Sequence, residues 1–321
     1  MIAAAEVVGG LLLLFLGGHS LVRGAATVAL LARISTAVVA LTVVSIGTSL
    51  PELAVSVDAA LRRSTDISYG NIIGSNIFNI GAILGIAALV SLIRVRRQMV
   101  RIEYPIMFAV SGLVLLLARD GVVDRLEGGF LVVLLVGFLA LMVYLARTDA
   151  ATAQSAEREV LRAAHVRDGT GRAWGRNVAF VVLGIAALIG GADLTVSGAV
   201  RIAEMIGVEQ RVIGLTVVAM GTSLPELATS LVAARRGEQE IALGNVVGSN
   251  IFNLLAILGI TATIVPIGVH PRALAVDNWV MIGLSAALLP LMLWGRRVSR
   301  RDGVLLLTGF VAYMTWVVVT G

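Results

Sequence analysis

Ten apolar segments, each long enough to cross a lipid bilayer, limit the possible folds of this chain more than any other feature. A transmembrane helix needs about 20 predominantly apolar residues. The composition agrees, because 14% of the residues are charged, whereas a soluble globular protein has about 25%. We therefore predict an all-α membrane protein with ten transmembrane helices. The predicted spans are residues 5–31, 36–61, 67–93, 102–118, 127–146, 177–200, 210–234, 240–266, 274–294 and 303–320.

The arginines predict how the chain is oriented, because cytoplasmic loops are enriched in Arg and Lys. All 25 basic residues are Arg. If the N-terminus is outside, 17 of them lie in inside loops and 7 in outside loops. We therefore expect a multi-pass protein of the plasma (inner) membrane with both termini outside. Residues 148–176, the one long polar stretch, are then a cytoplasmic linker.

The chain contains an internal repeat, in which residues 41–86 align without a gap onto residues 215–260. The offset is 174 residues, and 30 of the 46 aligned positions are identical. Five spans precede the linker and five follow it. Because five is odd, the second set must enter the membrane from the opposite side. We therefore predict two inverted five-helix repeats, 1–147 and 177–321, an architecture that many secondary transporters build around a midplane ion site.

The same six residues, Gly-Thr-Ser-Leu-Pro-Glu, occur at 47–52 and at 221–226, within two of the apolar segments. A carboxylate at membrane depth is costly, so Glu52 and Glu226 are candidate functional residues. The proline of each copy frees a backbone carbonyl, which is tolerated where a helix lines a cavity or a bound ion. Two such half-sites in one chain predict a central cation site.

Oxygen-bearing side chains accompany both motifs at helical spacing. On the third predicted span, for example, Asn71, Ser75 and Asn79 recur every four residues. Carboxylate, hydroxyl and amide oxygens suit Ca²⁺, Na⁺, Mg²⁺ or Mn²⁺ rather than Zn²⁺ or Cu, and neither core repeat contains Cys or His. Hydrogen bonding within the bundle is the alternative role for the hydroxyl and amide groups. The candidate ligands are Glu52, Glu226, Thr48, Ser49, Thr222, Ser223, Ser75, Asn79, Ser249 and Asn253.

The motifs GTSLPE and GNxxGSNIFN, each present twice, resemble the alpha-repeats of the sodium/calcium exchanger family within the calcium/cation antiporter superfamily. The resemblance covers most of the chain. It implies that Glu52 and Glu226 hold Ca²⁺ and Na⁺, that the other candidates above are further ligands, and that two backbone carbonyls take part. In the family these carbonyls match Ser45 and Ala219. Counting back from each proline instead frees the carbonyls of Gly47 and Gly221.

The resemblance implies a secondary antiporter that extrudes Ca²⁺ against inward Na⁺ by alternating access, with the first and sixth helices sliding against the core. Some potassium-dependent relatives have Asp where this chain has Asn253, so the sequence argues against potassium dependence. A proton-coupled exchanger of Ca²⁺ or another divalent cation is the alternative, and a cation channel is a second one. No Cys, His or Lys lies near either motif to activate a serine, so we expect no enzyme activity.

The expected partners are the transported ions and the lipid bilayer, without a cofactor or nucleic acid. The sequence leaves the oligomeric state open, and a monomer is compatible with it. Two further polar residues, His19 and Asp193, lie within the first and sixth predicted spans. Each of them has two possible roles, a hydrogen bond within the helix bundle or a position along the ion path.

Overall fold

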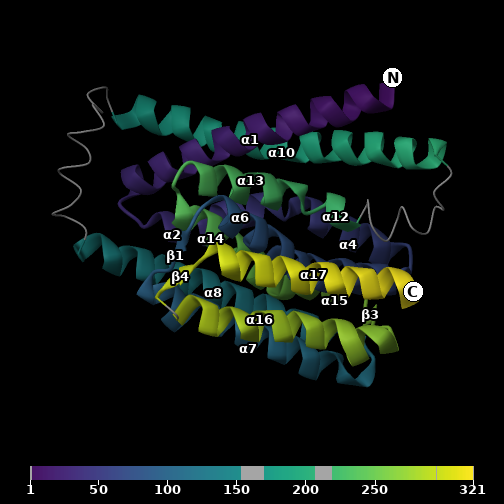
Figure 1. The fold of residues 1–321 in the computed structure, drawn as a ribbon. Coiled ribbons are helices and arrows are strands. Elements are labelled where there is room, and N and C mark those ends of the chain that lie inside the picture. Colours follow the sequence, from purple (N-terminus) through teal and green to yellow (C-terminus); the bar gives the residue numbers. More distant parts are fainter. Residues whose placement is uncertain (1, 153–169, 207–218, 294, 321) are drawn as a thin grey trace.

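The computed structural model describes residues 2–152, 170–206, 219–293 and 295–320, nearly all of them in helices (Figure 1). Within these ranges, 8 helices are long and apolar enough to cross a membrane, and a pair of helices bent by 44° is a candidate for a ninth span. The chain is therefore a helical, multi-span membrane protein, as predicted. The predicted span 210–234 is described only from residue 219 onward.

The first half begins with one long helix and continues through several spans that are divided into shorter pieces. Three of these spans contain a π-helical stretch, in which each backbone hydrogen bond reaches one residue further than in an α-helix. The elements are α1 (Ile2–Ala32), α2 (Thr36–Val39), η1 (Ala40–Val44), α3 (Ser45–Thr48), α4 (Leu50–Leu61), α5 (Thr65–Phe78), η2 (Asn79–Ile83), α6 (Leu84–Val90), β1 (Ile93–Arg94), η3 (Met99–Glu103), α7 (Tyr104–Leu117), η4 (Ala118–Asp120), β2 (Val122–Val123) and α8 (Arg125–Thr152).

Apart from η4, the second half has the same order of elements where it is described. Helix α8 continues to Thr152 and α10 begins at Thr170, so both described ends of the predicted linker are helical. The elements are α10 (Thr170–Met205), α12 (Ala219–Gly221), α13 (Leu224–Arg235), α14 (Gln239–Phe252), η6 (Asn253–Ile257), α15 (Leu258–Ile264), β3 (Ile267–Gly268), η7 (Ala273–Asp277), α16 (Asn278–Leu293), β4 (Arg297–Val298) and α17 (Arg300–Thr320).

The offset of 174 residues holds beyond the part of the chain in which the two halves align by identity. Helices α4, α5 and α6 shifted by 174 give the limits of α13, α14 and α15. The same shift turns η3 into η7, although neither lies within the aligned residues. The two halves therefore keep equivalent backbone features through their fourth spans.

Two spans form the centre of the molecule. In the span formed by residues 239–264, every residue of the most apolar stretch is buried, and in the span formed by residues 65–90 the buried share of that stretch is 83%. In each of the other long spans, the buried share is a third or less. The outer spans therefore present much of their surface to lipid. The two central spans contain four of the predicted ion ligands, which are Ser75, Asn79, Ser249 and Asn253.

Two short antiparallel strand pairs join loops of one half to loops of the other. Strand β1 pairs with β4, and β2 pairs with β3. Because β1 precedes η3 and α7 and β2 follows them, the two strand pairs lie at opposite ends of this span. In Figure 1, β1 and β4 lie at the left end, with the last turns of α8 and the first of α10. Both chain termini lie at the opposite end, with β3.

Helices α1 and α10 pack against each other along a row of small residues that are seven positions apart. A methyl group added at Gly17 would lie 2.9 Å from the carbonyl oxygen of Gly184, and the reverse substitution gives the same distance. Small residues allow such close approach between membrane helices. An ion pair of 2.9 Å between Arg201 Nη2 and Glu6 Oε1 also joins the two helices. Along this row, Ala3, Gly10, Gly17 and Gly24 of α1 face Gly198, Gly191, Gly184 and Asn177 of α10.

Candidate ion-binding site

Each six-residue motif lies at a break between two helices. Helix α3 ends at Thr48 and α4 begins at Leu50, and the intervening Ser49 has φ −85° and ψ 7°. In the second half, Ser223 precedes α13 with nearly the same angles, φ −89° and ψ 8°. The proline of each motif falls in the first turn of the new helix, where its missing N–H costs nothing. Each motif glutamate thus lies in the first turn of a helix, where the helix dipole favours a carboxylate.

The two motifs contact each other through reciprocal hydrogen bonds. Ser49 Oγ donates to Glu226 Oε1 at 2.8 Å, and Ser223 Oγ donates to Glu52 Oε1 at 2.8 Å. All four side chains are buried. The two carboxylates predicted as half-sites therefore lie in one site, and each is held by the serine of the other half.

Two asparagines extend this exchange between the halves. Asn71 Nδ2 donates to the Glu52 carbonyl at 3.4 Å and to Ser56 Oγ at 3.0 Å, while its Oδ1 accepts from Thr222 at 3.4 Å. Asn245 makes the equivalent contacts in the other half. Its Nδ2 donates to the Glu226 carbonyl at 3.3 Å and to Ser230 at 3.0 Å, and its Oδ1 accepts from Thr48 at 3.2 Å.

The sequence places Asn71 and Asn245 on the polar faces but outside the predicted ligand set. The structure shows that each fixes a motif threonine of the other half. A four-residue spacing from Ser75 and Ser249 is the signal that points to them. Their partners, however, come from the opposite half and cannot be read from helical periodicity.

The remaining predicted side chains are buried on the two central spans. Ser75 Oγ lies 3.3 Å from Ser223 Oγ, and Asn79 Nδ2 donates to Asn250 Oδ1 at 3.0 Å. Asn79 and Asn253 are the first residues of η2 and η6. Single turns of π-helix are common at functional sites. Here they begin at the two residues that the sequence predicts as equivalent ligands.

Five buried oxygens of the predicted ligands have no hydrogen-bond partner within the described part of the chain. One oxygen of each glutamate is among them, although its other oxygen accepts from a serine. Buried polar atoms in proteins are nearly always paired, so such a group requires an explanation. A bound cation would supply it, because each of these atoms has a free lone pair. The atoms are Glu52 Oε2, Glu226 Oε2, Asn79 Oδ1, Asn253 Oδ1 and Ser249 Oγ.

Of the two backbone carbonyls that the resemblance implies, that of Ser45 is described with its hydrogen bonds. The Ser45 carbonyl accepts the Ser49 N–H at 3.0 Å and Thr48 Oγ1 at 3.4 Å, so it lies beside the motif and is already paired. Its counterpart Ala219 is the first residue of α12. The participation of either carbonyl in ion binding stays a prediction.

The polar residues of the outer spans lie away from this site. His19 is exposed on α1 and its ring lies 4.9 Å from that of Phe15, and Asp193 is exposed on α10. Both side chains therefore lie on the outer surface of the bundle rather than inside it. The structure places neither beside the two glutamates.

The chain is similar to known proteins over nearly its whole length. The sequence model of the family described as sodium/calcium exchanger protein matches residues 2–144 and 176–319. The inner membrane protein YrbG of Escherichia coli (strain K12) is 40% identical over 319 residues, which cover 98% of this chain and 96% of YrbG. The sodium/calcium exchanger MaX1 of Methanosarcina acetivorans is 33% identical over 335 residues, with 95% of both chains covered.

The fold is similar to that of a solved exchanger. The sodium-calcium exchanger NCX_Mj, in a structure soaked with Na⁺ and Ca²⁺, superposes with a TM-score of 0.85 at 28% sequence identity, and 98% of each chain is covered. A second structure, soaked with Na⁺ and Sr²⁺, gives a TM-score of 0.84 at 29% identity. The helical arrangement around the two motifs is therefore shared with a protein of this class.

Proposed function

Because this chain belongs to the sodium/calcium exchanger protein family, we propose that it exchanges Ca²⁺ for Na⁺ across the plasma membrane. The five unpaired oxygens around Glu52 and Glu226 are the observation that supports this proposal most directly. Ca²⁺ takes six to eight oxygen ligands in flexible geometry. The hydroxyls and carbonyls that adjoin the two glutamates supply further oxygens of the same kind.

Charge balance explains why the two ions would compete for this site. With both carboxylates ionised, the site has a charge of −2, which one Ca²⁺ or two Na⁺ neutralise. Loading both kinds together would leave excess positive charge among buried groups, where Coulomb repulsion is strong. An ion of one kind therefore has to leave before the other can occupy the site fully. That exclusion is what an antiporter needs to couple the two flows.

The expected coupling can be measured with the purified protein in proteoliposomes. Uptake of radioactive Ca²⁺ should require Na⁺ inside the vesicles and should fall to background when choline replaces Na⁺. Full uptake driven by a pH gradient in the absence of Na⁺ would instead identify a proton-coupled exchanger. Uptake that needs no counter-ion at all would identify a channel.

We further propose that the two halves have inverted topology, so that both glutamates reach one site from opposite sides of the membrane. Two contacts support this arrangement. A side-chain carbon at Gly268 in β3 would lie 3.0 Å from Thr65 Oγ1, so the loop after α4 adjoins the β2–β3 end. The equivalent loop at Gly237 adjoins Arg94 and Val95 at the β1–β4 end. These are opposite ends of the span formed by η3 and α7.

This topology predicts opposite labelling of two equivalent arginines, Arg62 and Arg236, which are 174 residues apart and both exposed. The chain has no cysteine, so single cysteines can be introduced without other changes. In intact cells, an impermeant thiol reagent should label Arg62→Cys, and should label Arg236→Cys only after permeabilisation. Gly237 is less suitable because its φ of +77° would strain a cysteine.

A third position tests the linker. A cysteine at Ala153, which lies outside the described residues, should be protected from the reagent in intact cells. If Arg62→Cys and Arg236→Cys are labelled from the same side, the halves are parallel and the proposed midplane site is wrong.

A further inference from the structure

Two arginines lie directly opposite each other in the strand pair β1–β4. The register aligns Arg94 with Arg297, and both side chains are exposed. Like charges directly opposite in an antiparallel pair are destabilising. Neither side chain forms an ion pair with a carboxylate among the described residues. The pair therefore places two arginines on one side of the strand pair, since directly opposed residues of an antiparallel pair share a face.

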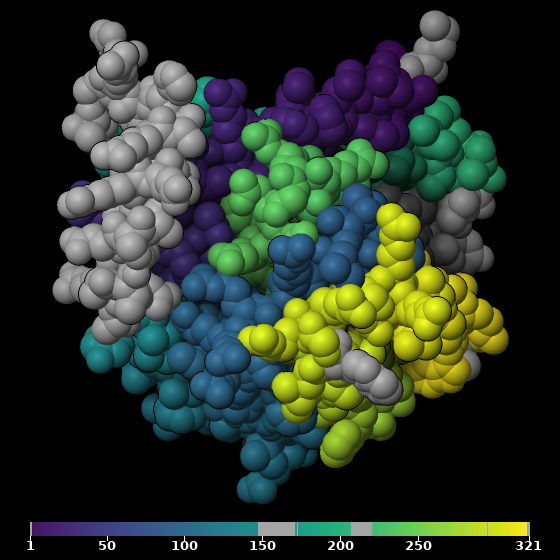
Figure 2. Space-filling model, turned by 60° about the vertical axis from the view of Figure 1, so that its left-hand side comes forward, coloured from purple at the N-terminus to yellow at the C-terminus, as the bar shows by residue number. Residues whose placement is uncertain are grey.

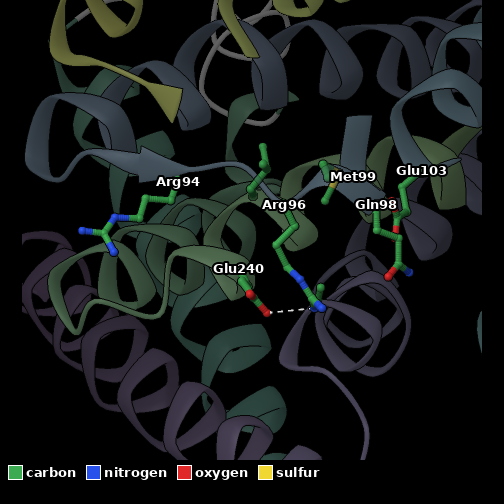
Figure 3. Close-up of a pocket in the computed structure, with 8 residues that line it drawn as sticks. Arg94, Arg96, Gln98, Met99, Glu103 and Glu240 are labelled. Carbon is green, nitrogen blue, oxygen red and sulfur yellow. Dashed lines mark hydrogen bonds and ion pairs between the residues drawn. The ribbon is translucent and has the colours of Figure 1, made fainter. Parts of the chain in front are cut away.

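The neighbouring ion pair on this face does not neutralise them. Arg96 Nη1 meets Glu240 Oε2 at 3.4 Å, across a small pocket whose other side is formed by Gln98 and Glu103. Figure 3 shows the Arg94 side chain pointing away from this pair. A second nearby carboxylate, that of Asp302, accepts from the backbone N–H and the hydroxyl of Ser299. Glu240 and Asp302 are thus engaged elsewhere. Glu238 lines one hollow with Arg94, but no ion pair joins these two side chains in the described part of the chain.

The equivalent strand pair at the other end of the molecule has no such charges. In β2–β3, the register aligns Val122 with Gly268, and Gly268 is the residue 174 positions after Arg94. The strand pair therefore forms without charged residues at these positions, and the fold itself does not require two arginines there. Of the two strand pairs, only β1–β4 therefore has arginines directly opposite each other.

The pair lies just beyond the ends of apolar spans, where headgroups would be expected. Strand β1 follows the last turn of α6, and β4 lies between α16 and α17, so both lie just beyond the ends of apolar spans. Two flanking leucines, Leu92 and Leu293, are 37% and 55% exposed. In Figure 2, the blue segment that includes β1 and the yellow C-terminal segment adjoin on this face. Charged groups next to exposed apolar side chains match a phospholipid, which is anionic at one end and apolar at the other.

From these observations we propose that Arg94 and Arg297 bind the phosphate of an anionic phospholipid. A guanidinium group can donate two parallel hydrogen bonds to a phosphate, and basic clusters on the cytoplasmic side recognise anionic lipids. One phosphodiester between the two arginines would replace their mutual repulsion with two attractions. Its acyl chains would lie along the apolar helix ends near Leu92 and Leu293.

The test uses the full-length protein, purified in detergent and freed of lipid, with bound lipid counted by native mass spectrometry. Phosphatidylglycerol should bind the wild type, and the double variant R94Q/R297Q should bind it at least tenfold more weakly. The control R300Q/R301Q removes the same charge from exposed residues of the same face and should stay within about twofold of the wild type. The other arginines of this face remain in both variants, so the orientation of the chain should not change.

Three results would overturn the proposal. Equal weakening in both variants would show diffuse surface charge rather than a site. Equal binding of phosphatidylcholine would show that the anionic headgroup is not recognised. Displacement of the lipid by equimolar inorganic phosphate would identify a site for the free anion.

Thermal unfolding tests lipid binding by Arg94 and Arg297 in a second, independent way. Without lipid, R94Q/R297Q should unfold at or above the temperature of the wild type, because the repulsion is gone. Added phosphatidylglycerol should raise the unfolding temperature of the wild type and leave that of the double variant unchanged. An equal rise in both proteins would contradict the proposal.

Discussion

Glu52→Gln and Glu226→Gln are each expected to lower Ca²⁺ exchange by about a hundredfold or more while the protein remains inserted and folded. The two side chains are 1% and 0% exposed, so each replacement removes one of two charges from a dry site. Breaking a buried charge pair costs about 3–5 kcal/mol, and every 1.4 kcal/mol is about tenfold in affinity. Glutamine keeps an oxygen that can accept the hydrogen bond from Ser223 or Ser49, so the fold should tolerate the change. The measurement is the initial rate of Ca²⁺ uptake into Na⁺-loaded proteoliposomes.

Asp58→Asn is the matched control for these two variants. Asp58 lies on the same helix as Glu52, but its side chain is 61% exposed and pairs with Arg62 at 2.8 Å. Its neutralisation should leave exchange within about twofold of the wild type, since surface ion pairs contribute little. Normal Ca²⁺ exchange by either glutamine variant would remove that glutamate from the ion site.

Gly221→Ala is expected to lower exchange about tenfold, and Gly47→Ala is expected to have a smaller effect. A methyl group at Gly221 would overlap the γ2 methyl of Val196 in α10, and one at Gly47 would overlap the δ1 methyl of Ile185 in the same helix. Overpacking of this kind costs about 1–3 kcal/mol. Valine is branched at Cβ and has little rotational freedom, whereas the end of an isoleucine side chain can move aside. The same uptake assay measures both variants.

The close contact with α10 therefore explains why each motif begins with glycine. The sequence around the motif does not reveal this contact. Gly137→Ala in α8 is the control, because none of the described residues lies within 4 Å of a methyl group there. That variant should be as active as the wild type. Wild-type exchange by Gly221→Ala would show that α10 need not lie this close to the motif during transport.

Much of the helical architecture can be predicted from the sequence. Apolar length locates the spans, and the two copies of the motif identify Glu52 and Glu226 as partners. These features are local or repeated, so they are readable along the chain. The chemistry of the candidate site is readable for the same reason, since hard oxygen ligands recur at helical spacing around each motif.

The contacts that join the halves could not be predicted. Nothing in the sequence indicates that Ser49 would donate its hydrogen bond to Glu226 rather than to Glu52. The choice of acceptor depends on how the two broken helices face each other. The roles of Asn71 and Asn245 depend on the same arrangement. The π-helical stretches that begin at Asn79 and Asn253 are also absent from any hydropathy pattern. Such features follow from tertiary packing, which periodicity within one helix does not encode.

The row of small residues between α1 and α10 sets the step by which these helices could shift along each other. Each contact in the row is seven residues from the next, which is about 10.5 Å of helix. A shorter displacement of one helix along the other would bring a larger side chain onto a glycine. The contact therefore has discrete registers rather than a continuous range. Any movement smaller than one such step must displace α1 and α10 together, as one rigid body against the rest of the protein.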